Sequence, residues 1–135
     1  MEEKGITLLE VLVCTAIFSI CLIPTLSIIR QSAINYEHAL GSYHADLELT
    51  NILSDARQAA KEGASNEFNI ALNNESRFEC VVIFKESTGG SVIVTHPPGT
   101  DLIISEAHID GDYNLITAAV RDIHTGVIKT QATLY

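Results

Sequence analysis

The sequence has few basic residues, and this shortage excludes several kinds of partner. Lysine and arginine together number 8 against 17 aspartates and glutamates, which gives a formal net charge of -9. An acidic surface of this kind repels phosphate backbones and anionic lipid headgroups. We therefore expect no nucleic-acid partner.

Cysteine is also scarce. The chain has only Cys14, Cys21 and Cys80. The first two lie inside one apolar run and the third stands alone in a predicted strand, so the sequence offers no disulfide framework. Cys14 and Cys21 share one face of a predicted helix, and we interpret them as small apolar residues at a packing seam.

The sequence lacks a recognisable set of catalytic residues. No nucleophile, base and orienting group share a motif, and no glycine-rich phosphate loop is present. The histidines are scattered, and only His38 and His44 share one predicted helix, at a spacing that does not place them on one face. We expect no enzymatic activity and no cofactor.

One acidic turn contains weak candidates for metal ligands. Asp110, Asp112 and Asn114 alternate as oxygen ligands do in a calcium-binding loop. However, Leu115 stands where such a loop needs a glycine, and Arg121 stands where it needs an acid. The sequence therefore predicts an acidic turn without a bound metal.

The sequence does have a long apolar run close to its start. Residues 11–29 include no charged residue, and residues 6–9 extend the run on the other side of Glu10. A helix of about 20 residues crosses a hydrocarbon core of about 30 Å. This predicts a membrane-spanning helix over residues 6–29. Pro24 removes one backbone donor within it and predicts a kink, after which the helix continues.

The helical pattern continues over residues 30–62. From Leu49 onward, apolar residues recur at the spacing of one helix face, and charged residues such as Glu48 and Arg57 fall elsewhere on the circumference. Gly63 is typical of a helix end. The sequence therefore predicts one helix over residues 6–62 that is apolar all round in its first half and amphipathic in its second.

Residues 63–135 are predicted to form a β-sheet head. Short runs rich in β-branched residues, separated by glycine, proline and aspartate, predict strands at 78–85, 91–96, 101–105, 115–122 and 127–135. The last two are separated by a short turn and predict a hairpin, whereas residues 64–76 predict a loose connection. The expected class is α+β, with a long helix packed against a small, meandering, mostly antiparallel sheet.

The letters "KG" followed by "ITLLEVLV" resemble the cleavage and methylation motif of type IV pilins and of the pseudopilins of type II secretion systems. The resemblance implies a leader peptide over residues 1–5, with Gly5 as its last residue. Prepilin peptidase would cut after Gly5, and Ile6 would become the N-methylated terminus. It also implies assembly with other pilins or pseudopilins through an inner-membrane assembly platform.

Glu10 has two interpretations. A carboxylate in hydrocarbon costs several kcal/mol and needs a partner or a shallow position. The resemblance implies an assembly role, in which Glu10 pairs with the α-ammonium of Ile6 on an adjacent subunit and sets the register. Alternatively, Glu10 lies at the membrane interface as an acid in the first helical turn, where the helix dipole favours it.

The C-terminal hairpin resembles that of the minor pseudopilin I of type II secretion and of its relative, the minor pilin V. The residues that carry this likeness are Val120, Arg121, Asp122, Thr125, Gly126, Thr133 and Leu134. The resemblance implies a single-pass protein of the bacterial inner membrane, with its head in the periplasm, at the tip of a pseudopilus.

Two alternatives remain open at this point. The first is a minor type IV pilin that serves adhesion, motility or DNA uptake. The second is a signal-anchored periplasmic binding module that never polymerises and in which Glu10 has no assembly role. Substitution of Glu10 by leucine distinguishes a filament subunit from such a module, because only the subunit should lose assembly.

Overall fold

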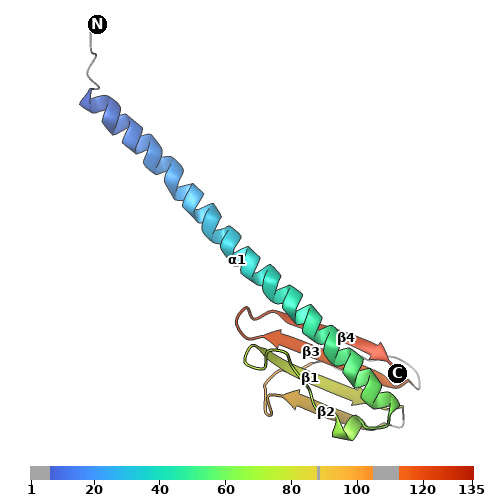
Figure 1. The fold of residues 1–135 in the computed structure, drawn as a ribbon. Coiled ribbons are helices and arrows are strands. Elements are labelled where there is room, and N and C mark those ends of the chain that lie inside the picture. The colour runs from blue at the N-terminus through green and yellow to red at the C-terminus, as the bar shows by residue number, and fades with distance from the viewer. Residues whose placement is uncertain (1–6, 88, 105–112) are drawn as a thin grey trace. The chain divides into compact units, whose positions relative to one another are not determined.

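The computed structural model describes residues 7–87, 89–104 and 113–135. It contains a helix of 54 residues and four strands, with one short 3₁₀ turn between them (Figure 1). The elements are α1 (Leu8–Lys61), η1 (Ser65–Glu67), β1 (Phe78–Lys85), β2 (Ser91–His96), β3 (Leu115–Asp122) and β4 (Ile128–Leu134). The predicted α+β class is therefore confirmed. The chain divides into two compact units, residues 1–37 and 38–135, which are described in turn.

The first unit is helical from Leu8 onward, and all of its described residues, 7–37, are exposed. The hydroxyl groups of Ser19, Thr25 and Ser27 donate hydrogen bonds to carbonyl oxygens one turn earlier, at 2.8, 2.8 and 3.1 Å. These bonds satisfy polar groups that an apolar environment would otherwise leave unpaired. The helix continues past Pro24, as predicted, whereas the bend expected there stays a prediction.

The helix ends where Gly63 was expected to end it. Gly63 has a φ of 70°, which is costly for other residues. Its amide donates to the carbonyl oxygen of Ala60 at 3.2 Å, and the amide of Ala64 donates to that of Ala59 at 2.9 Å. This pair of bonds is the Schellman pattern, which satisfies the last carbonyl groups of the helix.

In the second unit, α1 packs one face against the sheet (Figure 1). The apolar side chains that it buries are those of Ala45, Leu49, Ile52, Leu53 and Ala56. They meet residues of the two central strands, among them Val82 and Phe84 of β1 and Ile116 of β3. The predicted amphipathic face from Leu49 onward is therefore confirmed as the face that forms the core.

Glu48 departs from the expected pattern. We expected it away from the apolar face, but its residue is only 4% exposed. Its Oε2 atom has no hydrogen-bond partner among the described residues. The position follows from helix geometry, since Glu48 lies three residues after Ala45 and four before Ile52, which are both buried.

The four strands form one antiparallel sheet in the order β2-β1-β3-β4. The predicted hairpin of the last two strands is confirmed, and the predicted bounds of β1, β2 and β3 match those of the structure. The predicted meander is wrong, because β3 pairs with β1 and not with β2. Since β2 and β3 are both antiparallel to β1, they run parallel to each other on either side of it.

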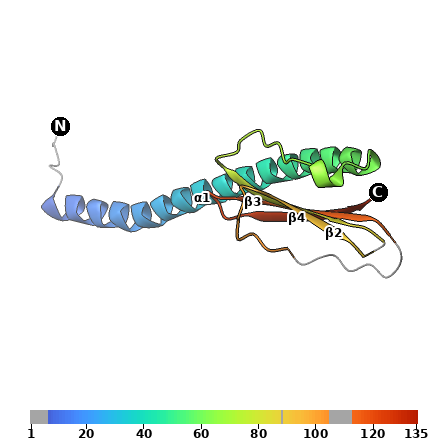
Figure 2. The ribbon, with the colours of Figure 1, turned by 90° about the horizontal axis from the view of Figure 1, so that it is seen from below.

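The predicted strand at 101–105 is wrong in its described part, because residues 101–104 pair with no strand. This segment lies on the face of the sheet opposite α1 (Figure 2). Leu102 packs there against Val81, Ile83 and Ala119 in a second, smaller core. The alternation of apolar side chains thus comes from packing onto the sheet and not from strand pairing.

The connection at 64–76, expected to be loose, is packed in part. Ile70 is buried, and so is Ser65 in the 3₁₀ turn η1. The ring of Phe68 meets the ring of Phe84 edge to face, with centroids 5.4 Å apart. The polar composition of residues 64–76 predicts a loose connection, but Ile70 and Phe68 pack it against the core.

Candidate functional site at the start of the helix

The start of α1 is held by a reciprocal pair of hydrogen bonds between Thr7 and Glu10. The carboxylate Oε2 of Glu10 accepts a bond from the backbone amide of Thr7 at 2.9 Å. The backbone amide of Glu10 in turn meets Thr7 at two atoms, the side-chain Oγ1 at 3.4 Å and the carbonyl oxygen at 3.0 Å. This is a capping box, in which a threonine precedes the helix and a glutamate three residues later reaches back to it.

The capping box places the carboxylate of Glu10 at the start of the helix, where unpaired amide groups favour a negative charge. One of the two carboxylate oxygens is thereby satisfied within the chain. The other, Oε1, accepts no hydrogen bond from any described residue. The first-turn role of Glu10 is thus supported by geometry, and one oxygen of the same carboxylate stays available to a further donor. The signal for the cap, Thr-Leu-Leu-Glu, was present in the sequence.

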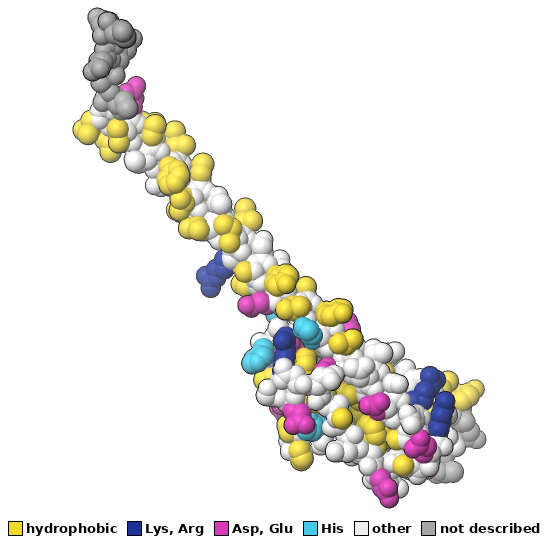
Figure 3. Space-filling view, in the orientation of Figure 1, with side chains coloured by type: hydrophobic (Ala, Val, Ile, Leu, Met, Phe, Trp, Pro, Cys, Tyr) yellow, Lys and Arg dark blue, Asp and Glu magenta, His cyan; other side chains and the backbone are white. Residues whose placement is uncertain are grey.

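An uncharged, exposed helix follows this cap. Its large apolar side chains are between 40 and 80% exposed from Leu8 to Ile29. Figure 3 shows them along the outside of the helix. The helix is long and apolar enough to cross a membrane, and none of the side chains in its apolar window is buried within the chain. This surface therefore needs an apolar environment that the described chain does not supply.

Several predicted site residues lie outside the described residues. These are Gly5 and Ile6 at the expected cleavage point and Asp110 and Asp112 in the acidic turn. The remaining candidate ligand, Asn114, already has partners, since its Oδ1 accepts from the amide of Ser87 at 2.9 Å. In the part of the chain that is described, no three histidine, cysteine or acidic side chains are grouped to hold a metal ion.

The head contains a buried carboxylate whose role the sequence did not predict. Asp122 is fully buried, and its Oδ2 accepts two hydrogen bonds from the guanidinium of Arg77, at 3.2 and 2.9 Å. Its Oδ1 accepts the backbone amides of His124 and Thr125 at 3.0 and 3.4 Å. Burial alone would raise the pKa of Asp122, but Arg77 and these turn donors hold it below its ordinary value. Asp122 thus fixes the turn between β3 and β4.

Gly41 brings α1 close to this turn. A Cβ atom at position 41 would lie 2.6 Å from the Oγ1 of Thr125 and 2.8 Å from the Oδ2 of Asp122. Only a glycine leaves room for that approach. The sequence does not predict this role of Gly41, because a single glycine within a helical pattern carries no local signal of what approaches it.

The comparisons with known proteins bear on the start of the chain. Residues 1–26 match the family model of the prokaryotic N-terminal methylation motif, which is the signal of type IV pilins and pseudopilins. Neither the search of curated proteins nor the search of solved structures gave a match. The motif supports a precursor of the type IV pilin or pseudopilin kind, which implies processing by prepilin peptidase and assembly with other pilins.

The motif and the helix together indicate a membrane-anchored protein. An apolar helix near the N-terminus and a pilin-type signal fit a protein anchored in a membrane by a single span. The motif also suggests a structural subunit and not an enzyme.

Proposed function

We propose that this protein is a minor pseudopilin that assembles into, or at the tip of, a periplasmic pseudopilus driving type II protein secretion. The observation that carries this proposal is the placement of Glu10. Glu10 lies in a capping box at the start of an exposed helix, ahead of its uncharged stretch. It also lies within the residues that match the methylation motif. An anchor alone would use Glu10 only as a helix cap, whereas the remaining carboxylate oxygen and the matching methylation motif support a further role between subunits.

The proposal assigns a role to each part of the chain. Residues 1–5 are the leader, which prepilin peptidase removes after Gly5 before Ile6 is methylated. Residues 6–29 hold the subunit in the bacterial inner membrane, with the bend at Pro24 easing its fit among neighbouring helices. Residues 30–62 join that span to the head, and residues 63–135 complete the head on the periplasmic side, where it contacts other minor subunits.

Assembly exchanges lipid contacts of the apolar helix for contacts with neighbouring helices. Because lipid tails are as apolar as the helix surface, this exchange supplies little directional preference of its own. A buried charge pair does supply such a preference, because any register that separates the two charges leaves each of them uncompensated in a low dielectric. We assign that pair to the carboxylate of Glu10, through its Oε1, and the α-ammonium of Ile6 on an adjacent subunit. Glu10 thereby both caps its own helix and sets the register between subunits.

The first test is intact mass and N-terminal fragmentation of the membrane-extracted protein from cells with and without prepilin peptidase. We expect a chain that begins at Ile6 with one added methyl group, found only when the peptidase is present. Gly5→Val is the matched variant, because it alters the cleavage point without touching the helix. A chain that keeps residues 1–5 in cells with the peptidase, or that is cut after the apolar run, would overturn the proposal.

The second test separates the capping role of Glu10 from its assembly role. Glutamine can also close a capping box, so Glu10→Gln keeps the cap and removes the charge, whereas Glu10→Leu removes both. We expect both variants to insert into the membrane and both to fail in co-assembly with other pseudopilins. Full assembly of Glu10→Gln would show that the charge is dispensable for assembly. Unchanged function of Glu10→Leu would instead favour a non-polymerising anchored module.

A third test distinguishes a type II secretion system from a type IV pilus system. Deletion of the gene should abolish export of secreted proteins while leaving twitching motility and DNA uptake intact. The opposite pattern would favour a minor type IV pilin.

A further inference from the structure

The outer edge of β4 carries backbone groups that no described strand pairs with. β4 is the last strand of the sheet and pairs only with β3. The amide of Tyr135 donates to Asn114, and Val127 accepts from Asp122, so the odd-numbered residues of β4 point their peptide groups toward β3. The peptide groups of Ile128, Thr130 and Ala132 therefore point outward, along the open edge.

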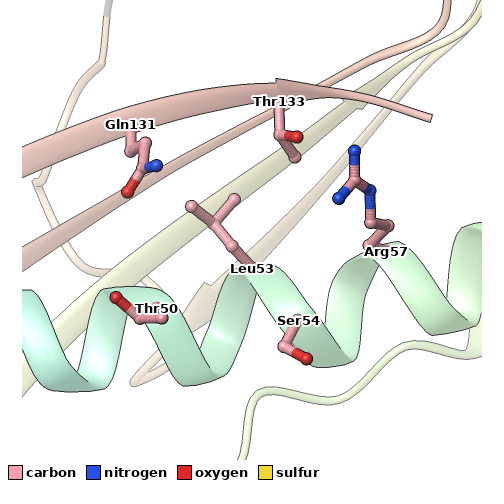
Figure 4. A pocket seen from close by; sticks show the side chains of 6 residues that line it. All are labelled: Thr50, Leu53, Ser54, Arg57, Gln131 and Thr133. Atoms are coloured by element: carbon pink, nitrogen blue, oxygen red, sulfur yellow. The ribbon is translucent and has the colours of Figure 1, made fainter.

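A groove runs beside this edge, between β4 and α1 (Figure 4). It has a volume of about 250 Å³, and five of its six lining residues carry a hydroxyl, amide or guanidinium group. The lining residues are Thr50, Leu53, Ser54, Arg57, Gln131 and Thr133. Two bonds hold α1 to β4 at its ends, from Lys129 to Asp46 at 3.1 Å and from Arg57 to the carbonyl oxygen of Leu134 at 3.0 Å.

One basic residue, Arg57, lines the groove. Arg57 donates to a neutral carbonyl oxygen, and Lys61 lies one helical turn further along α1. Neither forms an ion pair with any residue in the described ranges, whereas Arg77, Arg121 and Lys129 each have a carboxylate partner. The groove thus offers one guanidinium, that of Arg57, without a carboxylate partner among the described residues, beside a strand edge that no described strand pairs with.

We propose that the edge of β4 is a docking site for an extended, acid-bearing segment of a different protein, which adds to the sheet as a fifth strand. Outward peptide groups give such a strand its hydrogen bonds, and alternate side chains fall into the groove. A carboxylate on the side that faces α1 meets Arg57. A second copy of this chain fits less well, because its other open edge, β2 (Ser91–His96), carries no acidic residue.

The test uses the full chain in detergent micelles and three capped peptides of about seven residues. The first alternates threonine and valine around a central glutamate, the second has glutamine in its place, and the third is N-methylated at the residues whose amides would face β4. Amide hydrogen exchange, read by NMR, is the measurement. We expect the glutamate peptide to slow exchange at Ile128, Thr130 and Ala132, the glutamine peptide to bind about threefold more weakly, and the N-methylated peptide to give no protection.

Matched variants locate the effect on the protein. Arg57→Gln keeps a donor for Leu134 but removes the charge, so it should abolish the difference between the glutamate and glutamine peptides. Thr130→Pro removes one outward amide without touching the bonds to β3 and should block binding, whereas Thr130→Ala should not. Thr95→Pro, on the edge strand β2, should leave binding unchanged.

Three results would overturn the proposal. The first is a lack of protection at β4 by any peptide at millimolar concentration, and the second is equal protection at the outward amides of β2. The third is protection that rises with protein concentration alone, which would make a second copy the occupant. None of these measurements depends on N-terminal cleavage or methylation, so they stand or fall separately from the proposed secretion role.

Discussion

The two halves of α1 differ in what surrounds their apolar side chains. Residues 8–37 include no buried side chain in the described structure, although most of them are apolar. Residues 38–61 bury seven positions, and five of these form the core with the sheet. One continuous helix thus contains a half that the chain itself packs and a half that depends on an environment from outside the chain. Stability of the fold and function of the helix are therefore separable by mutation.

The sharpest test of this separation compares one isoleucine from each half. Ile52 is 2% exposed in the core, whereas Ile28 is 66% exposed. Ile52→Ala should lower the free energy of unfolding of the head by about 4 kcal/mol, through lost burial and the cavity left behind. Ile28→Ala should change it by less than about 0.5 kcal/mol. Urea unfolding of the full chain in detergent, followed by circular dichroism of the sheet, measures both.

Equal effects of the two substitutions on the free energy of unfolding would contradict this separation, because they would show that the head and the span unfold as one unit. If Ile28→Ala reduces subunit assembly but leaves the free energy of unfolding unchanged, the two halves of α1 have separate roles.

The second prediction concerns the charge buried in the head. Asp122→Asn should lower the free energy of unfolding by about 3 kcal/mol at neutral pH, because Arg77 and two turn amides lose their charged acceptor. The pKa of Asp122 is lowered in the fold, so its contribution is present above its ordinary value of 3.8 and is lost as pH falls through the folded value. The gap between wild type and variant should therefore narrow below about pH 4.

Urea titrations of both proteins from acid to neutral pH measure this gap. A difference that stays constant with pH would mean that the carboxylate acts through its shape alone.

The third prediction concerns the close approach of α1 to the turn between β3 and β4. Gly41→Ala should gain up to about 1 kcal/mol of helix propensity. Overcrowding of Thr125 and Asp122 outweighs that gain, so the net loss should be about 1 to 2 kcal/mol. In a Thr125→Ala background, which removes two of the three nearest atoms, the same substitution should cost less. A Gly41→Ala protein that is more stable than wild type would show that the turn moves freely away from the helix.

The sequence predicted the elements that depend on local pattern. Hydrophobic periodicity and turn residues predict the helix, its end at Gly63, the bounds of three strands and the hairpin. These signals depend only on residues that are close together in the sequence. The cap at Glu10 carried its own signal in Thr7. The crossing of residues 101–104 under the sheet could not be predicted, because strand order depends on partners far apart in sequence. The burial of Glu48 and Asp122 likewise could not be predicted. The first depends on which face of α1 packs on the sheet, and the second on how closely α1 approaches the turn between β3 and β4.

The last prediction compares the cysteines of the two regions. Cys14 and Cys21 are exposed on the apolar helix, whereas Cys80 is buried in the core. Burial, with Glu48 and Glu79 nearby, raises the pKa of the Cys80 thiol from 9.0 to about 12. In the unfolded chain this thiol ionises near its ordinary pKa, so the native state binds more protons between the two values and loses stability as pH rises above 9.0.

The size of this effect should be about 1 kcal/mol between pH 8 and pH 10. Cys80→Ala isolates it, because the alkaline titration of every other group is common to both proteins and cancels in the difference. Cys14→Ala is the matched control for the loss of a thiol, because Cys14 is exposed on the apolar helix and lies outside the folded head. If Cys80→Ala keeps the full slope, then the buried thiol is not what weakens the head at high pH. The core around Cys80 would then admit water, and the contrast between the packed and unpacked halves of the chain would be smaller than the burial indicates.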